Sequence, residues 1–232
     1  MIGFYDYTVV LTYISLMTSV FGMTQAIHGR FKTAVFCLAL SGLFDMFDGK
    51  IARTKKNRTD DQKAFGIQID SLCDVVCFGA FPALICYLLG VRGFLGLAII
   101  FVYCTCSVIR LAYFNVLEGK RQQEDGGVNK YYHGLPITSI AVILPLIFML
   151  QFVISDVLFM GLLHLMLLVV GILFIVDFPF KKPNNRILAV LVVVVGAALL
   201  MMIAYTRFRP PSMHKDSNPI IEEIEEMVGE TQ

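Results

Sequence analysis

Charged residues are scarce in this chain. Of its 232 residues only 16% are Asp, Glu, Lys or Arg, whereas 57% are hydrophobic, and the mean hydropathy is +0.73. A soluble globular domain usually carries about 25% charged residues. The composition therefore excludes an ordinary soluble domain and indicates an all-α, polytopic membrane protein. The net charge of +1 points to no particular partner, and we expect no nucleic-acid ligand.

Cysteines are absent from the polar loops. All six lie inside apolar runs, at Cys37, Cys73, Cys77, Cys86, Cys104 and Cys106. A disulfide scaffold would place them in external loops. Cys73 and Cys77 lack a second pair of thiols, so we expect no zinc site. The first apolar run has no basic segment before it, and we interpret it as a membrane span rather than a signal peptide.

Seven apolar runs are long enough to cross a bilayer as helices, for which about 20 residues are needed. They lie at about 7–28, 32–52, 66–90, 93–117, 134–155, 157–177 and 186–206. We expect the first six to form a transmembrane helix bundle and the seventh to be an additional C-terminal span. The sequence thus predicts one membrane domain over residues 1–206 and a polar tail over residues 207–232.

Basic residues are distributed unevenly among the loops between these runs. The loops 53–65, 118–133 and 178–186 contain five, three and three Lys or Arg residues, whereas the loops of the opposite side contain three in all. Membrane proteins keep such basic loops in the cytoplasm. We therefore expect a protein of the cell membrane whose three basic loops face the cytoplasm.

Four aspartates lie where the second and third runs approach each other. Asp45 and Asp48 are spaced i,i+3. Gly66, Asp70 and Asp74 are spaced i,i+4,i+8, so each set lies on one face of its helix. Two helices joined by a short loop run antiparallel, and the two faces can converge. Four carboxylates at one place repel unless cations hold them, and oxygen donors without His or Cys favour Mg²⁺ or Mn²⁺.

Small residues and one arginine accompany these aspartates. Gly49, Ala52 and Gly66 would let a bulky group lie against the backbone. Arg53 offers a bidentate cation suited to a phosphate, and two metal ions about 4 Å apart can clamp a pyrophosphate. The alternative is that the aspartates only pair with Lys and Arg of the loops. Two further acids, at positions 60 and 61, lie off this pattern, and we expect them to be solvated in the loop.

The complete spacing matches a known signature. The sequence contains Asp45-x-x-Asp48-Gly49-x-x-Ala52-Arg53 and, after a polar loop, Gly66-x-x-x-Asp70-x-x-x-Asp74. This pattern resembles the signature of the CDP-alcohol phosphotransferase family. The loop between its two halves is longer than is usual in the family, but both helical faces keep their internal spacing.

The resemblance implies a role for each residue of the pattern. The implied ligands of two divalent ions, Mg²⁺ or Mn²⁺, are Asp45, Asp48, Asp70 and Asp74. The residues implied to contact the nucleotide and its phosphates are Asp48, Gly49, Ala52, Arg53 and Gly66. Asp74 is also implied to be the general base.

Three further stretches resemble the branch of the family that uses L-serine as the acceptor. They are Asp70–Pro82 (DSLCDVVCFGAFP), Arg110–Asn115 (RLAYFN) and Gly134-Leu-Pro136. The departures are Tyr113 in place of an arginine and Thr138 in place of a proline. The resemblance covers about residues 8–180. It implies a homodimer that transfers the phosphatidyl group of CDP-diacylglycerol to L-serine among membrane lipids.

The acceptor needs binding residues of its own. A serine carboxylate needs a cation, and Arg110 lies in the fourth run, about two turns before its end. We therefore take Arg110, and on the same helix Asn115, as candidates to bind serine; the alternatives for Arg110 are snorkelling to the interface or a structural ion pair. Other acceptors, glycerol 3-phosphate or an inositol phosphate, and an archaeal-type lipid donor remain alternatives. A cation transporter is disfavoured because the acids cluster at one membrane face.

Overall fold

The computed structural model describes residues 3, 7–52, 59–123, 131–181 and 196, and these are almost entirely helical. The helical elements are η1 (Tyr7–Val9), α1 (Val10–Ile27), α2 (Phe31–Ala52), α3 (Asp60–Asp74), η2 (Val75–Ala80), α4 (Phe81–Leu89), α5 (Gly93–Gln123), η3 (Ile137–Ser139), α6 (Ile140–Leu150) and α7 (Asp156–Ile175). Two short strands, β1 (Tyr131–His133) and β2 (Pro179–Lys181), complete the described elements. The predicted class, an all-α transmembrane bundle, is confirmed.

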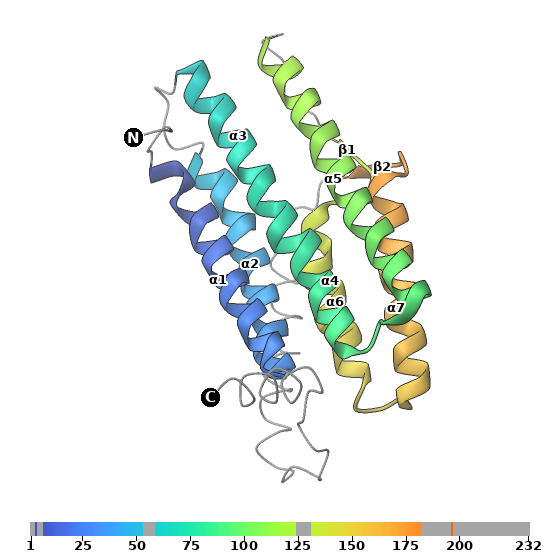
Figure 1. Ribbon diagram of the computed structural model, residues 1–232. Coiled ribbons are helices and arrows are strands. Elements are labelled where there is room, and N and C mark those ends of the chain that lie inside the picture. Colours follow the sequence, from blue (N-terminus) through green and yellow to red (C-terminus); the bar gives the residue numbers. More distant parts are fainter. Residues whose placement is uncertain (1–2, 4–6, 53–58, 124–130, 182–195, 197–232) are drawn as a thin grey trace, which may run out of the picture.

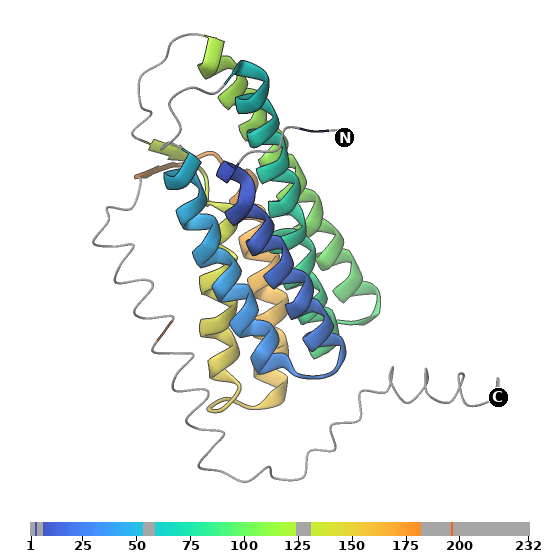
Figure 2. The ribbon, with the colours of Figure 1, turned by 90° about the vertical axis from the view of Figure 1, so that its left-hand side faces the viewer.

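The long helices lie roughly side by side (Figures 1 and 2). α3, η2 and α4 follow one another without a break and form a single rod. The largest contacts join α1 to α2 and α5 to α7, and α6 packs on α2. α3 and α5 project beyond the other helices at the end of the bundle where α1 begins and α2 ends. The carboxylates discussed below belong to the helices of this end.

Several helices have the length and composition of membrane spans. Among the described residues four qualify: α1, the rod Asp60–Leu89, Gly93–Lys120 of α5, and α7. Residues Ile137–Leu150 form a shorter apolar helix. α2 is 22 residues long but carries two aspartates and two lysines. The chain is therefore an integral membrane protein, whereas the predicted seventh span at 186–206 and the tail 207–232 lie outside the described residues, apart from residue 196.

The rod begins earlier than the sequence analysis predicted. α3 starts at Asp60 rather than at Gly66 because Thr59 and Gln62 form a capping box. In this box the Thr59 side chain accepts the Gln62 N–H, and the Gln62 side chain accepts the Thr59 N–H, both at 3.2 Å. The prediction that Asp60 and Asp61 belong to the loop was therefore wrong. Both lie in the exposed first turn of α3, and Asp60 pairs with Lys63 at 2.9 Å.

The fourth and fifth predicted spans also end at other residues than expected. α5 continues to Gln123 instead of ending near residue 117. The predicted span 134–155 is the shorter helix Ile137–Leu150. Pro136, directly before this helix, has an extended backbone, and turns follow Leu150. A further element was not predicted at all: β1 and β2 pair antiparallel, with Tyr132 opposite Phe180.

The chain leaves this ladder through a turn at Gly134, which has a φ of +72°. A Cβ at this position would lie 2.8 Å from the Val176 carbonyl oxygen and 2.9 Å from Arg110 Nη1. The Gly134 N–H donates to the Phe178 carbonyl. Only glycine fits this backbone and this close approach. At this turn the segment before α6 packs against the end of α7 and against Arg110 of α5.

Candidate functional site

Three of the predicted aspartates converge between α2 and the rod. One carboxylate oxygen from each of Asp45, Asp70 and Asp74 lies within 4.8 Å of the other two. Asp45 lies on α2, whereas Asp70 and Asp74 lie one turn apart on α3. The i,i+4 spacing on one helix and the antiparallel course of the other account for this meeting. We call these three residues, together with Asp48, the aspartate cluster.

Asp48 lies at the edge of the cluster and is only 8% exposed. Its Oδ2 accepts a hydrogen bond of 3.2 Å from Thr12 Oγ1 of α1. Three of the four predicted metal ligands thus converge, and the fourth, Asp48, lies three residues after Asp45 on the same helix, α2.

Three members of the aspartate cluster, Asp45, Asp70 and Asp74, have no compensating charge among the residues that the structure describes. None of these residues forms an ion pair with Asp45, Asp70 or Asp74. Two like charges about 5 Å apart repel by on the order of 3 kcal/mol at the dielectric of a protein surface. Asp70 Oδ1 is buried and has no hydrogen-bond partner in this part of the chain. These contacts do not support the alternative that the three aspartates serve only to pair with Lys and Arg.

The donor set fits a hard divalent cation. The atoms that converge are all carboxylate oxygens, the ligands that Mg²⁺ and Mn²⁺ prefer. The unpartnered oxygen of Asp70 points to the same conclusion, because a buried charged oxygen without a partner is costly. The cluster can therefore hold metal ions, which would offset its own repulsion.

The other residues of the predicted signature are only partly described. Gly66 lies on α3, one turn before Asp70. Gly49 and Ala52 lie in the last turn of α2, where the structure describes the backbone alone. Arg53 lies outside the described residues. The small residues thus lie on the same two helices as the cluster. Their contact with a nucleotide stays a prediction.

A π-helical turn, η2, begins directly after Asp74. In it the Phe81 N–H donates to the carbonyl of Val76, five residues earlier. Pro82 has no N–H, so it cannot supply the α-helical donor to the carbonyl of Phe78. The hydroxyl of Tyr103 on α5, which is fully buried, donates to this carbonyl at 2.5 Å. Sequence analysis missed the role of Tyr103, since only Pro82 signals that a donor is missing.

Asn115 links α5 to the helix that carries Asp70. Its Oδ1 accepts a hydrogen bond of 2.6 Å from Ser71 Oγ, and its Nδ2 donates to Gln68 Oε1 at 3.3 Å. Ser71 directly follows Asp70 in the sequence. Asn115 therefore lies beside the aspartate helix.

Arg110 faces a different neighbour. It is 5% exposed, and its Nη1 donates to the Phe174 carbonyl of α7 at 3.0 Å. Its guanidinium lies 4.5 Å from the centre of the Phe114 ring. Arg110 and Asp177 line the same cavity of about 310 Å³ between α5 and the end of α7. The two predicted acceptor residues thus have different surroundings, α3 for Asn115 and α7 for Arg110.

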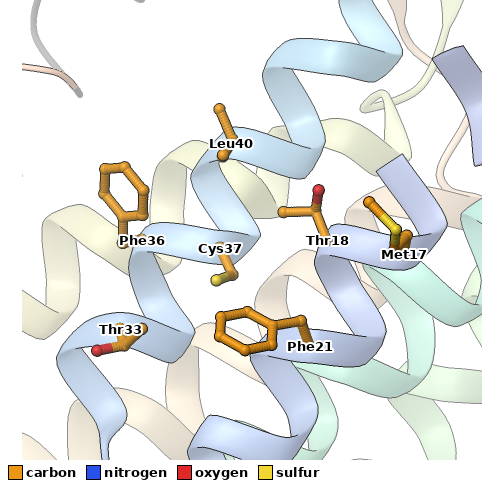
Figure 3. A pocket seen from close by; sticks show the side chains of 7 residues that line it. All are labelled: Met17, Thr18, Phe21, Thr33, Phe36, Cys37 and Leu40. Atoms are coloured by element: carbon orange, nitrogen blue, oxygen red, sulfur yellow. The ribbon is translucent and has the colours of Figure 1, made fainter. Parts of the chain in front are cut away.

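A second cavity lies between α1 and α2 (Figure 3). Its volume is about 430 Å³. It is lined by Met17, Thr18, Phe21, Thr33, Phe36, Cys37 and Leu40. None of these side chains carries a charge, so the chemistry of a phosphate group is not expected there.

Comparison with known proteins identifies the family. The family model described as CDP-alcohol phosphatidyltransferase matches residues 7–166, which include the whole aspartate cluster. The chain belongs to this family. The prediction from the aspartate spacing is thereby confirmed, and the chain is an integral-membrane enzyme that transfers a substituted phosphate group.

Curated relatives give more detail. A CDP-diacylglycerol–serine O-phosphatidyltransferase of Mycobacterium bovis is 30% identical over 206 residues, covering 82% of this chain and 69% of the relative. The Saccharomyces cerevisiae protein of the same name is 35% identical over 115 residues, covering 49% of this chain and 40% of the relative. An archaetidylserine synthase of Methanothermobacter thermautotrophicus is 33% identical over 133 residues, covering 57% and 53%.

Proposed function

We propose that this enzyme transfers the phosphatidyl group of CDP-diacylglycerol to the hydroxyl group of L-serine, giving phosphatidylserine and CMP. The observation that carries the proposal is the convergence of Asp45, Asp70 and Asp74 within 4.8 Å. This geometry suits the binding of a pyrophosphate through metal ions. The choice of serine is supported by the names of the relatives.

The aspartate cluster would hold two divalent ions, Mg²⁺ or Mn²⁺. Bound there, such ions would neutralise the negative charge of the pyrophosphate and stabilise the charge that develops on the departing CMP. By their position in the signature, Gly49, Ala52 and Gly66 would line the nucleotide, and Arg53 would contact a phosphate. The unpartnered Oδ1 of Asp70 supports the metal assignment.

Asp74 is the proposed general base. Its carboxylate would accept the proton of the serine hydroxyl, provided that the two groups come within hydrogen-bond distance. The serine oxygen then forms a bond to the β-phosphorus of CDP-diacylglycerol. The bond from this phosphorus to the bridging oxygen breaks, and its electron pair stays on the phosphate of CMP. Asp74 is the last residue of α3, directly before the π-turn, and its backbone is helical.

Arg110 and Asn115 are the proposed serine-binding residues. A free amino acid carries one negative and one positive group. Asp177 lines the same cavity as Arg110, so one charged side chain of each sign faces it. The guanidinium of Arg110 suits a carboxylate geometrically. Asn115, which lies beside Ser71, would contact the acceptor from the aspartate side.

The proposed location is the cell membrane, with the cluster facing the cytoplasm. The three loops on this side hold eleven of the Lys and Arg residues between the predicted spans, against three on the other side. Soluble serine and CMP could then exchange with the cytoplasm while the lipid chains stay in the bilayer. Family resemblance supports a homodimer.

An acceptor screen tests the proposal. Purified full-length protein with CDP-diacylglycerol is given L-serine, glycerol 3-phosphate or inositol phosphate, and the release of CMP is measured. We expect serine alone to stimulate release. Stimulation by another acceptor and not by serine would overturn the assignment. Because one relative is an archaetidylserine synthase, the screen should be repeated with the corresponding archaeal-type ether-lipid donor.

A further inference from the structure

α1 presents a stripe of small and hydroxyl-bearing residues to the aspartate helices. Its buried residues are Thr12, Ser15, Ser19, Gly22 and Ala26. Their spacing of three and four residues places them on one face of the helix. The family signature begins only at Asp45, so it assigns no role to this face.

Close packing and hydrogen bonds fix the position of α1 along the axis of α2. The hydroxyl groups of Ser15 and Ser41 lie 2.7 Å apart, and Ser19 Oγ donates to Ser41 Oγ at 2.8 Å. A Cβ at Gly22 would lie 2.7 Å from Cys37 Cβ and would overlap the Phe81 ring. Small residues of this kind allow two membrane helices to approach closely. The position of Thr12 along α2 is therefore well defined.

Thr12 reaches the aspartate cluster directly. Its hydroxyl donates to Asp48 Oδ2 at 3.2 Å, and the two side chains are only 5% and 8% exposed. Asp48 is one of the four predicted metal ligands and lies three residues after Asp45 on α2. A hydroxyl that donates to one oxygen of a carboxylate restricts the rotation of that carboxylate and orients it for a metal ion. Mutation of such a supporting group typically lowers metal affinity or activity by about 10- to 100-fold.

We propose that Thr12 is a positioning residue, which holds the Asp48 carboxylate in the orientation that binds a divalent cation. This inference rests on the proposed metal site and adds α1 to it. Thr12 itself touches neither substrate nor metal in this proposal; it acts through Asp48.

The test is Mn²⁺ binding by purified full-length protein, followed through the electron paramagnetic resonance signal of free Mn²⁺. Thr12→Val keeps the shape of the side chain but removes the donor. We expect Mn²⁺ affinity to fall by about 10- to 100-fold, whereas Thr12→Ser should keep it near the wild-type value. The matched control is Thr18→Val on the same helix, because the Thr18 hydroxyl bonds to the Ile14 carbonyl of α1 and, among the described residues, to no aspartate. This control should bind Mn²⁺ as the wild type does.

The outcomes separate this inference from the proposed function. If wild-type protein binds Mn²⁺ and Thr12→Val binds it equally well, the role of Thr12 is refuted while the metal site stands. If the wild-type protein binds no Mn²⁺, both proposals fail. Should Thr12→Val not fold, Thr12→Ala takes its place in the same titration. Equal loss of affinity in Thr12→Ser would also refute the inference, since serine retains the hydroxyl.

Discussion

Two regions of the bundle bury charge in opposite ways. In the aspartate cluster, carboxylate oxygens of Asp45, Asp70 and Asp74 lie within 4.8 Å of one another, and one buried oxygen of Asp70 has no partner among the described residues. At Arg110 the guanidinium bonds to a backbone carbonyl, lies over the Phe114 ring and shares its cavity with Asp177. Folding therefore provides interactions for Arg110 but brings Asp45, Asp70 and Asp74 together with no cation among the described residues. The comparison indicates that the cluster needs cations from outside, whereas Arg110 could bind serine only by exchanging or sharing internal contacts.

The largest expected effect is on the chemistry at Asp74. Asp74→Asn removes the proposed proton acceptor while keeping the size of the side chain. We expect CMP release with serine to fall by about 10²- to 10⁴-fold, the usual contribution of a general base. The measurement is the rate of purified protein that still elutes as a single folded species. Substantial activity in this variant would refute the role of Asp74 as base.

A smaller effect concerns the repulsion within the cluster. Asp70→Asn removes one of the like charges, so the metal-free variant should unfold several degrees above the metal-free wild type, since about 1 kcal/mol corresponds to about 2–4 °C at this size. Saturating Mn²⁺ should stabilise the wild type by about 2.7 kcal/mol at 100 times its Kd and the variant much less. Unfolding can be followed with a thiol-reactive dye because five of the six free cysteines are buried.

The control for this prediction is Asp60→Asn. It makes the same change of charge on the same helix, but Asp60 is exposed and pairs with Lys63. Its unfolding temperature should change little, with or without Mn²⁺. A metal-free Asp70→Asn variant that is less stable than the wild type would contradict the view that the cluster is repulsive before metal binds.

The π-turn after Asp74 provides the next prediction. Tyr103→Phe deletes the hydroxyl that donates to the Phe78 carbonyl in place of the N–H that Pro82 lacks. Loss of a buried hydrogen-bond partner usually costs about 1–3 kcal/mol, so thermal unfolding should occur at a lower temperature. Tyr113→Phe is the control because Tyr113 is half exposed and packs edge-on against Phe114. Equal stability of the two variants would show that the Tyr103 hydrogen bond does not support the turn.

Sequence alone predicted the cluster because its information is local. Helical spacing places Asp70 and Asp74 on one face, and a short loop makes the two helices antiparallel, so convergence with Asp45 follows. The start of α3 is also determined by neighbouring residues, the Thr59–Gln62 capping box. The polar composition of this segment nevertheless suggested a loop. The contacts of Thr12 and Tyr103 depend on how separate helices pack, and nothing in a single sequence specifies this. The pairing of β1 with β2 was missed for the same reason.

The last and smallest effect tests the other side of the comparison. Arg110→Lys keeps the positive charge but loses the planar fork that binds a carboxylate through two hydrogen bonds. We expect the KM for serine to rise about tenfold, or about 1.4 kcal/mol, while the KM for CDP-diacylglycerol stays unchanged. The control is Arg92→Lys, because Arg92 also donates to a carbonyl and lies over an aromatic ring, both of Tyr87, but is exposed. If Arg110→Lys lowers only the unfolding temperature and leaves both KM values at the wild-type level, Arg110 is a structural residue. The serine carboxylate would then bind elsewhere, and the balanced charges at Arg110 would serve the packing of α5 on α7.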